Sequence, residues 1–309
     1  MKKFLTNIFL YIGSILFVLF LFECSLYTQE NEFSYKKHYI ETHLNDIKIL
    51  TLGSSLFEIS IDPSLIGESI FNGNLSGIGN IYKNSATYQM AVNYVPQMKN
   101  LEVLIVPFPL NDVYAGSDDW KYEDSPTSKT FKCLMVKYLH ILTDPRDIVY
   151  WSEILNSSMD YIGRFQHSNK ENRMCDSLGF VSLNRELVNR NKDWDKPIET
   201  TIRLKPREET SHIITAYCDI AEICKANNVK FICIATPYHQ NRINQIPQQM
   251  INDYLYVIST IKKKHPEVAF YNFTDDKRFT SNDFQDLVHL NNNGAKKFSK
   301  ILKKEILSW

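Results

Sequence analysis

Residues 47–62 read IKILTLGSSLFEISID, and this stretch joins a strand pattern to a sharp turn. The run ILTL at residues 49–52 has the length and apolar character of a buried strand. Gly53 then permits a sharp change of direction and leaves Ser54 and Ser55 just after the strand. Ligands of open α/β sheets bind at the carboxyl ends of the strands. The stretch therefore fits a strand that delivers a serine hydroxyl to a site, and it fits a plain turn as well.

Four further apolar runs have the pattern of strands, and they alternate with amphipathic helices. The strands are predicted at residues 69–72, 101–106, 229–235 and 268–273, and the main helices at residues 82–99, 213–227, 250–265 and 294–307. Strands that alternate with crossover helices form a largely parallel sheet covered on both faces. We expect an α/β protein of the flavodoxin-like, three-layer α/β/α type with about five strands.

Residues 114–206 interrupt this alternation with polar turns, and helical patterns occur there near residues 131–142 and 148–161. We interpret the segment as an insertion that partly covers the site. The insertion would belong to one domain, residues 47–309.

The N-terminal segment has the pattern of a membrane anchor. An apolar run covers residues 4–22, and about 19 helical residues span roughly 28 Å, close to the thickness of a bilayer core. Lys2 and Lys3 precede the run and acidic residues follow it, so the positive-inside rule places the N-terminus in the cytoplasm. We predict a single-pass signal anchor (residues 1–27), a tether (residues 28–46) and an extracytoplasmic domain, in the periplasm or at the cell surface. A cleaved signal peptide is the alternative and gives the same compartment.

Composition and motifs exclude several classes of function. The formal net charge is zero, so no general attraction to nucleic acid is expected. The chain contains no phosphate-binding loop, nucleotide fingerprint or metal-ligand spacing, and we predict neither a metal nor a cofactor. None of the six cysteines forms a C-x-x-C pair. Cys218, Cys224 and Cys233 fit buried positions in a helix and a strand, although some cysteines could pair in an oxidising compartment.

A second candidate catalytic segment lies near the C-terminus, where residues 283–291 read DFQDLVHLN. Asp286 and His289 are three residues apart, in a loop after the last predicted strand. A carboxylate at that spacing can bind one imidazole nitrogen and leave the other free as a general base. A solvent-exposed Asp beside a His that caps the last helix fits the pattern equally well.

Four blocks of the chain resemble, in the same order, the sequence blocks of the SGNH (GDSL-like) hydrolase superfamily. The blocks are Gly53-Ser54-Ser55-Leu56, Phe71-Asn72 with Ser76-Gly77, Leu110-Asn111-Asp112, and Asp286-x-x-His289 continued by Leu290-Asn291-x-x-Gly294-Ala295-x-x-Phe298. The resemblance covers residues 47–112 and 205–307, and it leaves the insertion unexplained.

The resemblance implies roles for individual residues. Ser55 would be the nucleophile, and His289 would be its general base, oriented by Asp286. The oxyanion hole would consist of the backbone N–H groups of Ser55 and Gly77 and the side chain of Asn111. An amide side chain suits this role because it donates a hydrogen bond without carrying charge.

The chain departs from the family pattern in three places. Ser54 stands where the family has an Asp before the nucleophile. Pro109 replaces the Gly that usually lies two residues before the Asn of the third block. Gly79 competes with Gly77 for the place in the second block. The Gly-Ser-Ser variant is similar to membrane-anchored relatives that act on cell-envelope polymers, including proteins of teichoic acid D-alanylation and of exopolysaccharide acetylation.

The anchor and the resemblance together predict an extracytoplasmic serine esterase or O-acyltransferase that works through an acyl-serine intermediate. The expected acyl group is acetyl, and the expected substrate is an acylated cell-envelope or exported polysaccharide. A membrane-bound acyltransferase is a candidate partner. The alternative is a catalytically silent SGNH-like component that binds or assembles within a polysaccharide-modification machinery.

Overall fold

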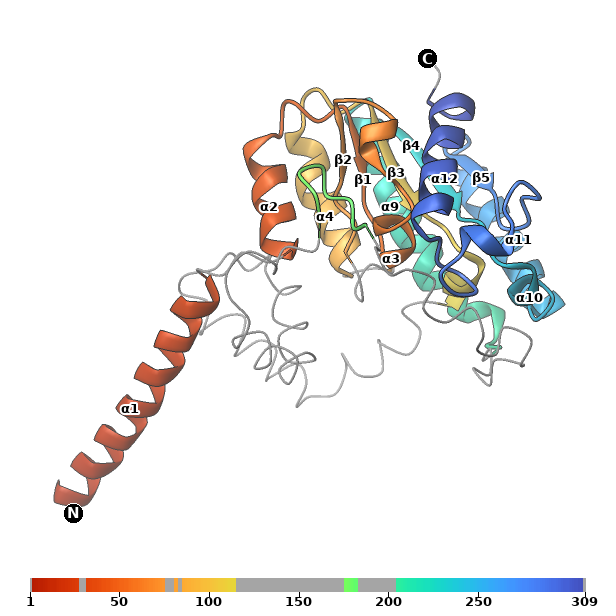
Figure 1. Cartoon of the computed structure of the whole chain (residues 1–309). Helices are drawn as coiled ribbons and strands as arrows, with labels where there is room; N and C mark the ends of the chain where they lie inside the picture. Colours follow the sequence, from red (N-terminus) through yellow and green to blue (C-terminus); the bar gives the residue numbers. More distant parts are fainter. Residues whose placement is uncertain are drawn as a thin grey trace.

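The computed structural model describes residues 2–27, 32–75, 81–82, 85–114, 175–182 and 204–307. These residues contain a five-stranded parallel sheet with helices on both faces (Figure 1). The strands are β1 (Ile49–Thr51), β2 (Ile70–Asn72), β3 (Val103–Pro107), β4 (Lys230–Ala235) and β5 (Ala269–Asn272). Their order, β2-β1-β3-β4-β5, is that of flavodoxin-like doubly wound sheets. The predicted α/β class and parallel sheet are thus confirmed.

The helices of the described part include the four that the periodicity predicts within the domain. The predicted ones are α4 (Ala86–Tyr94), α9 (Ser211–Ala226), α11 (Gln248–Lys264) and α12 (Asn292–Glu305). The others are α1 (Lys2–Tyr27), α2 (Glu32–Thr42), α3 (Ser55–Glu58) and α10 (Gln240–Ile243). Short 3-10 turns lie at Pro63–Leu65, Val95–Gln97, Leu110–Tyr114, Arg207–Thr210 and Ser281–Asp283.

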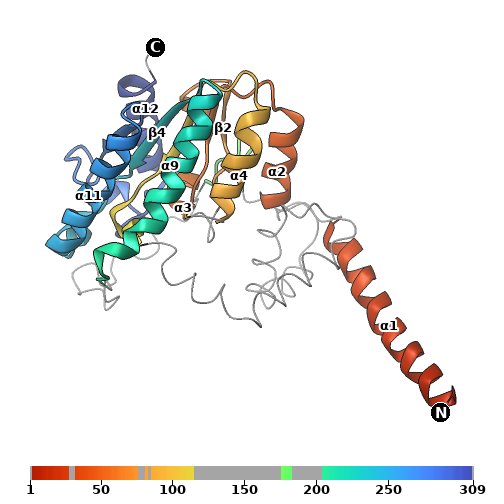
Figure 2. The same cartoon turned by 180° about the vertical axis from the view of Figure 1, so that it is seen from behind.

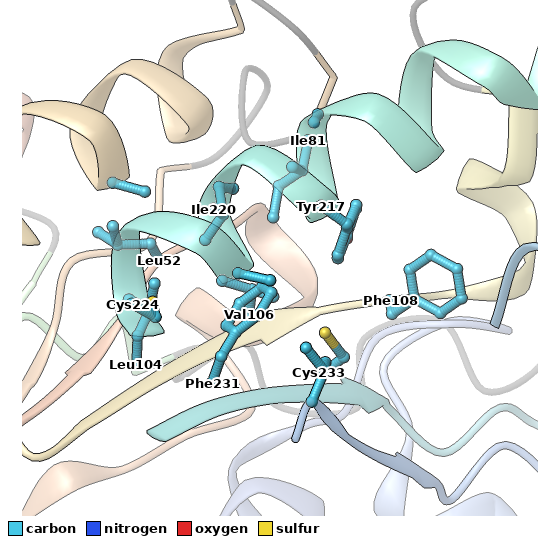
Figure 3. Packing of buried hydrophobic residues seen from close by; sticks show 14 of the residues in the cluster. Leu52, Ile81, Leu104, Val106, Phe108, Tyr217, Ile220, Cys224, Phe231 and Cys233 are labelled. Carbon is cyan, nitrogen blue, oxygen red and sulfur yellow. The ribbon is translucent and has the colours of Figure 1, made fainter. Parts of the chain in front are cut away.

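The strands bury both faces because successive side chains point to opposite sides of the sheet. On one face, Leu104, Val106 and Phe231 pack in a cluster with residues of α4, α9 and α11 (Figure 2). Figure 3 shows Tyr217 and Ile220 of α9 in this cluster. On the other face, a second cluster joins the alternate strand residues to α3 and α12. The sheet is therefore the middle of three layers, and its carboxyl edge is left for the site.

Helix α2 lies in the segment that we predicted to be a tether. Ile40 is fully buried in the first cluster, and Tyr39 stacks on Phe71 of β2 with ring centroids 4.2 Å apart. Lys36 is also fully buried. The sequence did not indicate this packing because a lysine occupies one of the buried positions, so no continuous apolar stripe is visible.

Helix α1 covers the predicted anchor and exposes large apolar side chains, among them Phe4, Phe9 and Leu10. No helix among the described residues has both the length and the apolarity needed to cross a membrane. The predicted transmembrane helix is therefore not found among the described residues.

Only a small part of the predicted insertion is described. The helical patterns at residues 131–142 and 148–161 lie outside the described residues. Residues 175–182 are described and pack against β2, where the Asn72 N–H donates to the carbonyl of Leu178 (2.9 Å). A Cβ on Gly179, which has a φ of 85°, would lie 2.1 Å from the carbonyl oxygen of Asn72. The glycine thus allows this part of the insertion to approach the sheet edge closely.

Candidate active site

Ser55 is the first residue of α3 and follows β1 after a tight turn. A Cβ on Gly53 would lie 2.3 Å from ring atoms of Pro107 at the end of β3. A glycine is required here because the turn passes directly against the neighbouring strand. Ser54 is buried as the N-cap of α3, whereas Ser55 is partly exposed. The structure therefore presents the Ser55 hydroxyl, not that of Ser54, at the carboxyl edge of the sheet.

Ser55, His289 and Asp286 form a continuous hydrogen-bonded chain. The Ser55 Oγ lies 3.0 Å from the His289 Nε2, and the His289 Nδ1 lies 2.7 Å from the Asp286 Oδ2. A carboxylate can only accept, so in the neutral ring the proton lies on Nδ1. The Nε2 atom is then free to accept the Ser55 proton. The structure brings together the three residues that the sequence assigned to the reaction.

Asp286 is held as an ionised hydrogen-bond acceptor. Its Oδ1 accepts from the backbone N–H groups of Val288 (2.9 Å) and His289 (2.8 Å). Burial alone would raise the pKa of Asp286, but these bonds and the contact with the His289 ring outweigh it and lower the pKa. The carboxylate therefore stays charged and can keep accepting the hydrogen bond from the His289 Nδ1.

The loop that carries His289 is closed at its base. Phe284 and Leu290 form an antiparallel bridge, and the Gln285 N–H donates to the His289 carbonyl (2.9 Å). The His239 N–H donates to the carbonyl of Leu287 (3.0 Å) from the segment after β4. These contacts fix the backbone on both sides of the His289 imidazole.

The residues that follow His289 anchor the loop to α12. Asn291 is the N-cap of α12, and its side chain accepts from the backbone N–H groups of Asn293 and Gly294. A Cβ on Gly294 would lie 2.1 Å from the carbonyl oxygen of Asp283. The Asn and the Gly of the fourth block are therefore explained by loop geometry.

Asn111 lies in the 3-10 turn after β3, and a buried arginine fixes its amide. The Asn111 Oδ1 accepts from the Arg242 Nη2 at 2.9 Å. A guanidinium group only donates hydrogen bonds, so the Oδ1 must face Arg242 and the amide NH₂ must point another way. Sequence reasoning predicted Asn111 and missed Arg242, which is 131 residues away along the chain. Gly77 and its competitor Gly79 lie outside the described residues.

Asn72 of the second block has a structural role. Its Nδ2 donates to the carbonyls of Ile61 (2.8 Å) and Glu58 (3.1 Å), which follow Ser55 at the end of α3 and just beyond it. Its Oδ1 accepts from the Nδ2 of Asn74 (2.7 Å). The second block thus holds the helix that begins with Ser55.

A buried ion pair also supports α3. The Lys36 Nζ contacts the Glu58 Oε1 and donates to the Asn74 carbonyl (2.5 Å), and the side chains of Lys36 and Glu58 are 0% and 1% exposed. Lys36 therefore connects α2 both to α3 and to the chain segment that leads towards Gly77. This role could not be predicted from the sequence, because Lys36 lies in a segment rich in charged and aromatic residues.

Asp112, next to Asn111, is a second carboxyl group at this edge. Burial raises its pKa to about 7. Asp112 is therefore largely protonated in mildly acidic solution and ionises only near neutral pH. Sequence analysis placed it in the third block without assigning it a role.

Cys218, Cys224 and Cys233 are buried, as predicted, and so is Cys175. These three and Cys175 are free thiols. Burial raises the pKa of Cys224 to about 12. Such a thiol is a poor nucleophile, so these side chains act as small packing groups.

Comparison with known proteins gives little further information. The model of one family, which is uncharacterised, matches residues 200–309. This region carries β4, β5 and the Asp286–His289 loop, and it excludes Ser55. No curated protein matches the chain. The SGNH resemblance therefore stays a prediction that depends on the four sequence blocks.

Proposed function

We propose that the protein is a serine esterase or O-acyltransferase of the SGNH type. The observation that carries the proposal is the hydrogen-bonded chain from the Ser55 Oγ through His289 to Asp286, with contacts of 3.0 Å and 2.7 Å. A serine is a weak nucleophile until an adjacent base accepts its proton, and the base must be oriented by a third group. Ser55 would be the nucleophile, His289 the base and Asp286 the orienting group, and each lies within hydrogen-bond distance of the next.

In the proposed reaction, the Ser55 Oγ attacks the carbonyl carbon of an ester while its proton passes to the His289 Nε2. The resulting oxyanion accepts hydrogen bonds from the Ser55 N–H and the Asn111 amide, and the family pattern adds the N–H of Gly77. His289 then donates the proton to the departing alcohol oxygen, which leaves an acyl-Ser55 ester. Water or a sugar hydroxyl attacks this ester with His289 again as base, and Ser55 is released.

Asn111 would contribute through the orientation that Arg242 imposes. With its Oδ1 bound by Arg242, the amide has only its NH₂ group to offer to the oxyanion. The charged partner also polarises the amide and strengthens it as a donor. Loss of one oxyanion donor typically raises the barrier by about 3 kcal/mol.

We further propose that the substrate is an acylated cell-envelope or exported polysaccharide and that the domain lies outside the cytoplasm. The apolar run at residues 4–22 and the two lysines before it support this location. Digestion of intact cells and of spheroplasts with a protease tests it. Cleavage of the domain by protease added outside the cytoplasmic membrane supports the extracytoplasmic location. Protection of the domain in spheroplasts would exclude that location.

The activity is tested on the full-length protein with a fluorophosphonate probe and with p-nitrophenyl acetate. We expect labelling and turnover in the wild type, and loss of both in Ser55→Ala and His289→Ala. Ser281→Ala is a matched control, because the Ser281 Oγ also lies 2.8 Å from a histidine, the Nε2 of His239. That histidine accepts from the Asn241 N–H through its Nδ1, so its Nε2 carries the proton and cannot activate Ser281. A folded wild type without labelling would favour the catalytically silent alternative.

A further inference from the structure

Arg242 is a buried cation at the carboxyl edge of the sheet. It lies on the short helix α10, after β4, and its exposed fraction is 9%. His239 caps this helix and also binds the backbone of the His289 loop. Arg242 therefore belongs to the segment that connects the catalytic loop with the end of β3.

Arg242 forms no salt bridge within the described part of the chain. Among the described residues its guanidinium group makes one hydrogen bond, to the neutral Oδ1 of Asn111. The Nε atom is buried and has no hydrogen-bond partner. The hydroxyl of Thr236, on the same segment, is also buried without a partner.

A cation in this position is costly unless an anion accompanies it. Removing a charge from water costs several kcal/mol when no partner compensates it. Guanidinium groups are suited to bind carboxylates and phosphates, because their planar fork presents parallel N–H donors to two oxygens. Orienting Asn111 would not require a charge, since a neutral amide could donate the same bond.

We propose that Arg242 binds an anionic group, a carboxylate or a phosphate, that the substrate carries close to its ester. The inference rests on the proposed function, because it places the anion beside the residue that would hold the oxyanion. The substrate would then be an acidic polymer, with either uronic acid residues or phosphodiester links. The anion would guide the ester towards Ser55 and lower the cost of burying Arg242.

The kinetic test compares three acetylated methyl glycosides of one size: a neutral glucoside, a glucuronide and a glucoside 6-phosphate. For acetate release by the full-length wild type, kcat/KM should be at least tenfold higher for one of the anionic esters than for the neutral one. The preferred ester shows whether the anion that Arg242 binds is a carboxylate or a phosphate. Arg242→Gln removes the charge that polarises the Asn111 amide, so it should lower all rates, and it should bring the ratio of anionic to neutral kcat/KM close to one. Arg242→Lys should retain part of the preference.

A control and a binding measurement separate this inference from the proposed function. Lys277→Gln removes an exposed cation that contacts Gln240 of α10, and it should leave the ratio unchanged. In Ser55→Ala, which cannot react, calorimetry should show uronate or polyol-phosphate oligomers binding at least tenfold more tightly than neutral oligosaccharides, and adding Arg242→Gln should abolish the difference. Turnover without anionic preference, or a preference that survives Arg242→Gln, overturns the inference alone. Absence of turnover and labelling overturns the proposed function, and the calorimetry still decides on Arg242.

Discussion

Replacement of Lys36 by Met would remove the cation that contacts the buried carboxylate of Glu58. Both side chains are essentially inaccessible to solvent, and the Lys36 Nζ also binds the Asn74 carbonyl at 2.5 Å. Breaking a buried pair by removing one partner typically costs about 3–5 kcal/mol. That loss is a large fraction of the roughly 5–15 kcal/mol that stabilises a domain. We therefore expect Lys36→Met to lower the free energy of unfolding by about 3–5 kcal/mol.

The same substitution should affect the site, since α3 begins at Ser55 and ends at Glu58. Release of Glu58 loosens the helix that holds the nucleophile, so fluorophosphonate labelling should slow even at a denaturant concentration where the protein is folded. Removing both charges, in Lys36→Met with Glu58→Leu, leaves no unpaired charge and should recover most of the lost stability. Labelling need not recover with it, because the bond to the Asn74 carbonyl stays broken.

Lys37→Met provides the matched control for this prediction. Lys37 is the next residue, is about one-third exposed, and pairs with Glu41 within the same helix. Such pairs contribute about 0.3–0.5 kcal/mol. Urea unfolding followed by circular dichroism compares the variants directly. Equal unfolding free energies for Lys36→Met and Lys37→Met would refute the view that α2 is an integral part of the domain.

Three further predictions concern the catalytic loop and its neighbours. Asp286→Asn should lower kcat for p-nitrophenyl acetate by about 10²–10⁴-fold, since the ring loses its orienting carboxylate; unchanged kcat would remove Asp286 from the reaction. Gly294→Ala places a Cβ 2.1 Å from the Asp283 carbonyl oxygen, so we expect slower labelling of Ser55 and a lower Tm, and a wild-type Tm would contradict the assigned loop geometry. Burial raises the pKa of Asp112 from 3.8 to about 7, so the folded protein holds this proton more tightly than the unfolded chain. The contribution of Asp112 to stability is therefore lost as pH rises from about 4 to about 7. Asp112→Asn should gain stability relative to the wild type at pH 8 and not at pH 4, and an equal difference at both values would contradict the burial of this carboxyl.

Local patterns in the sequence predicted most of the sheet and one half of the site. Each strand is an apolar run, and α9 and α11 have apolar faces with a clear helical period. The contact between Asp286 and His289 joins residues three apart, so their spacing was informative by itself. The contact between Ser55 and His289 joins residues 234 apart. Only the expectation of a common sheet edge and the family resemblance connected these two residues.

The features that the sequence did not reveal depend on contacts over long separations. Lys36 is a charged residue at a buried position, and its partner Glu58 is 22 residues away. Arg242 is close to Asn111 only because the ends of β3 and β4 are adjacent in the sheet. The short helices α3 and α10 have too few residues to show a helical period. Composition and periodicity describe which residues are buried in regular elements, and they do not describe which polar groups meet at the ends of those elements.

The central claim is that Ser55 carries the acyl group during the reaction. The most direct test is to mix full-length protein with p-nitrophenyl acetate, quench with acid within the first turnover, and analyse the peptides by mass spectrometry. We predict one acetyl group on the peptide that contains Ser55, on Ser55 and not on Ser54, and none in His289→Ala. Turnover of the ester without acetylation of Ser55, or acetylation that persists in His289→Ala, would contradict the proposed mechanism.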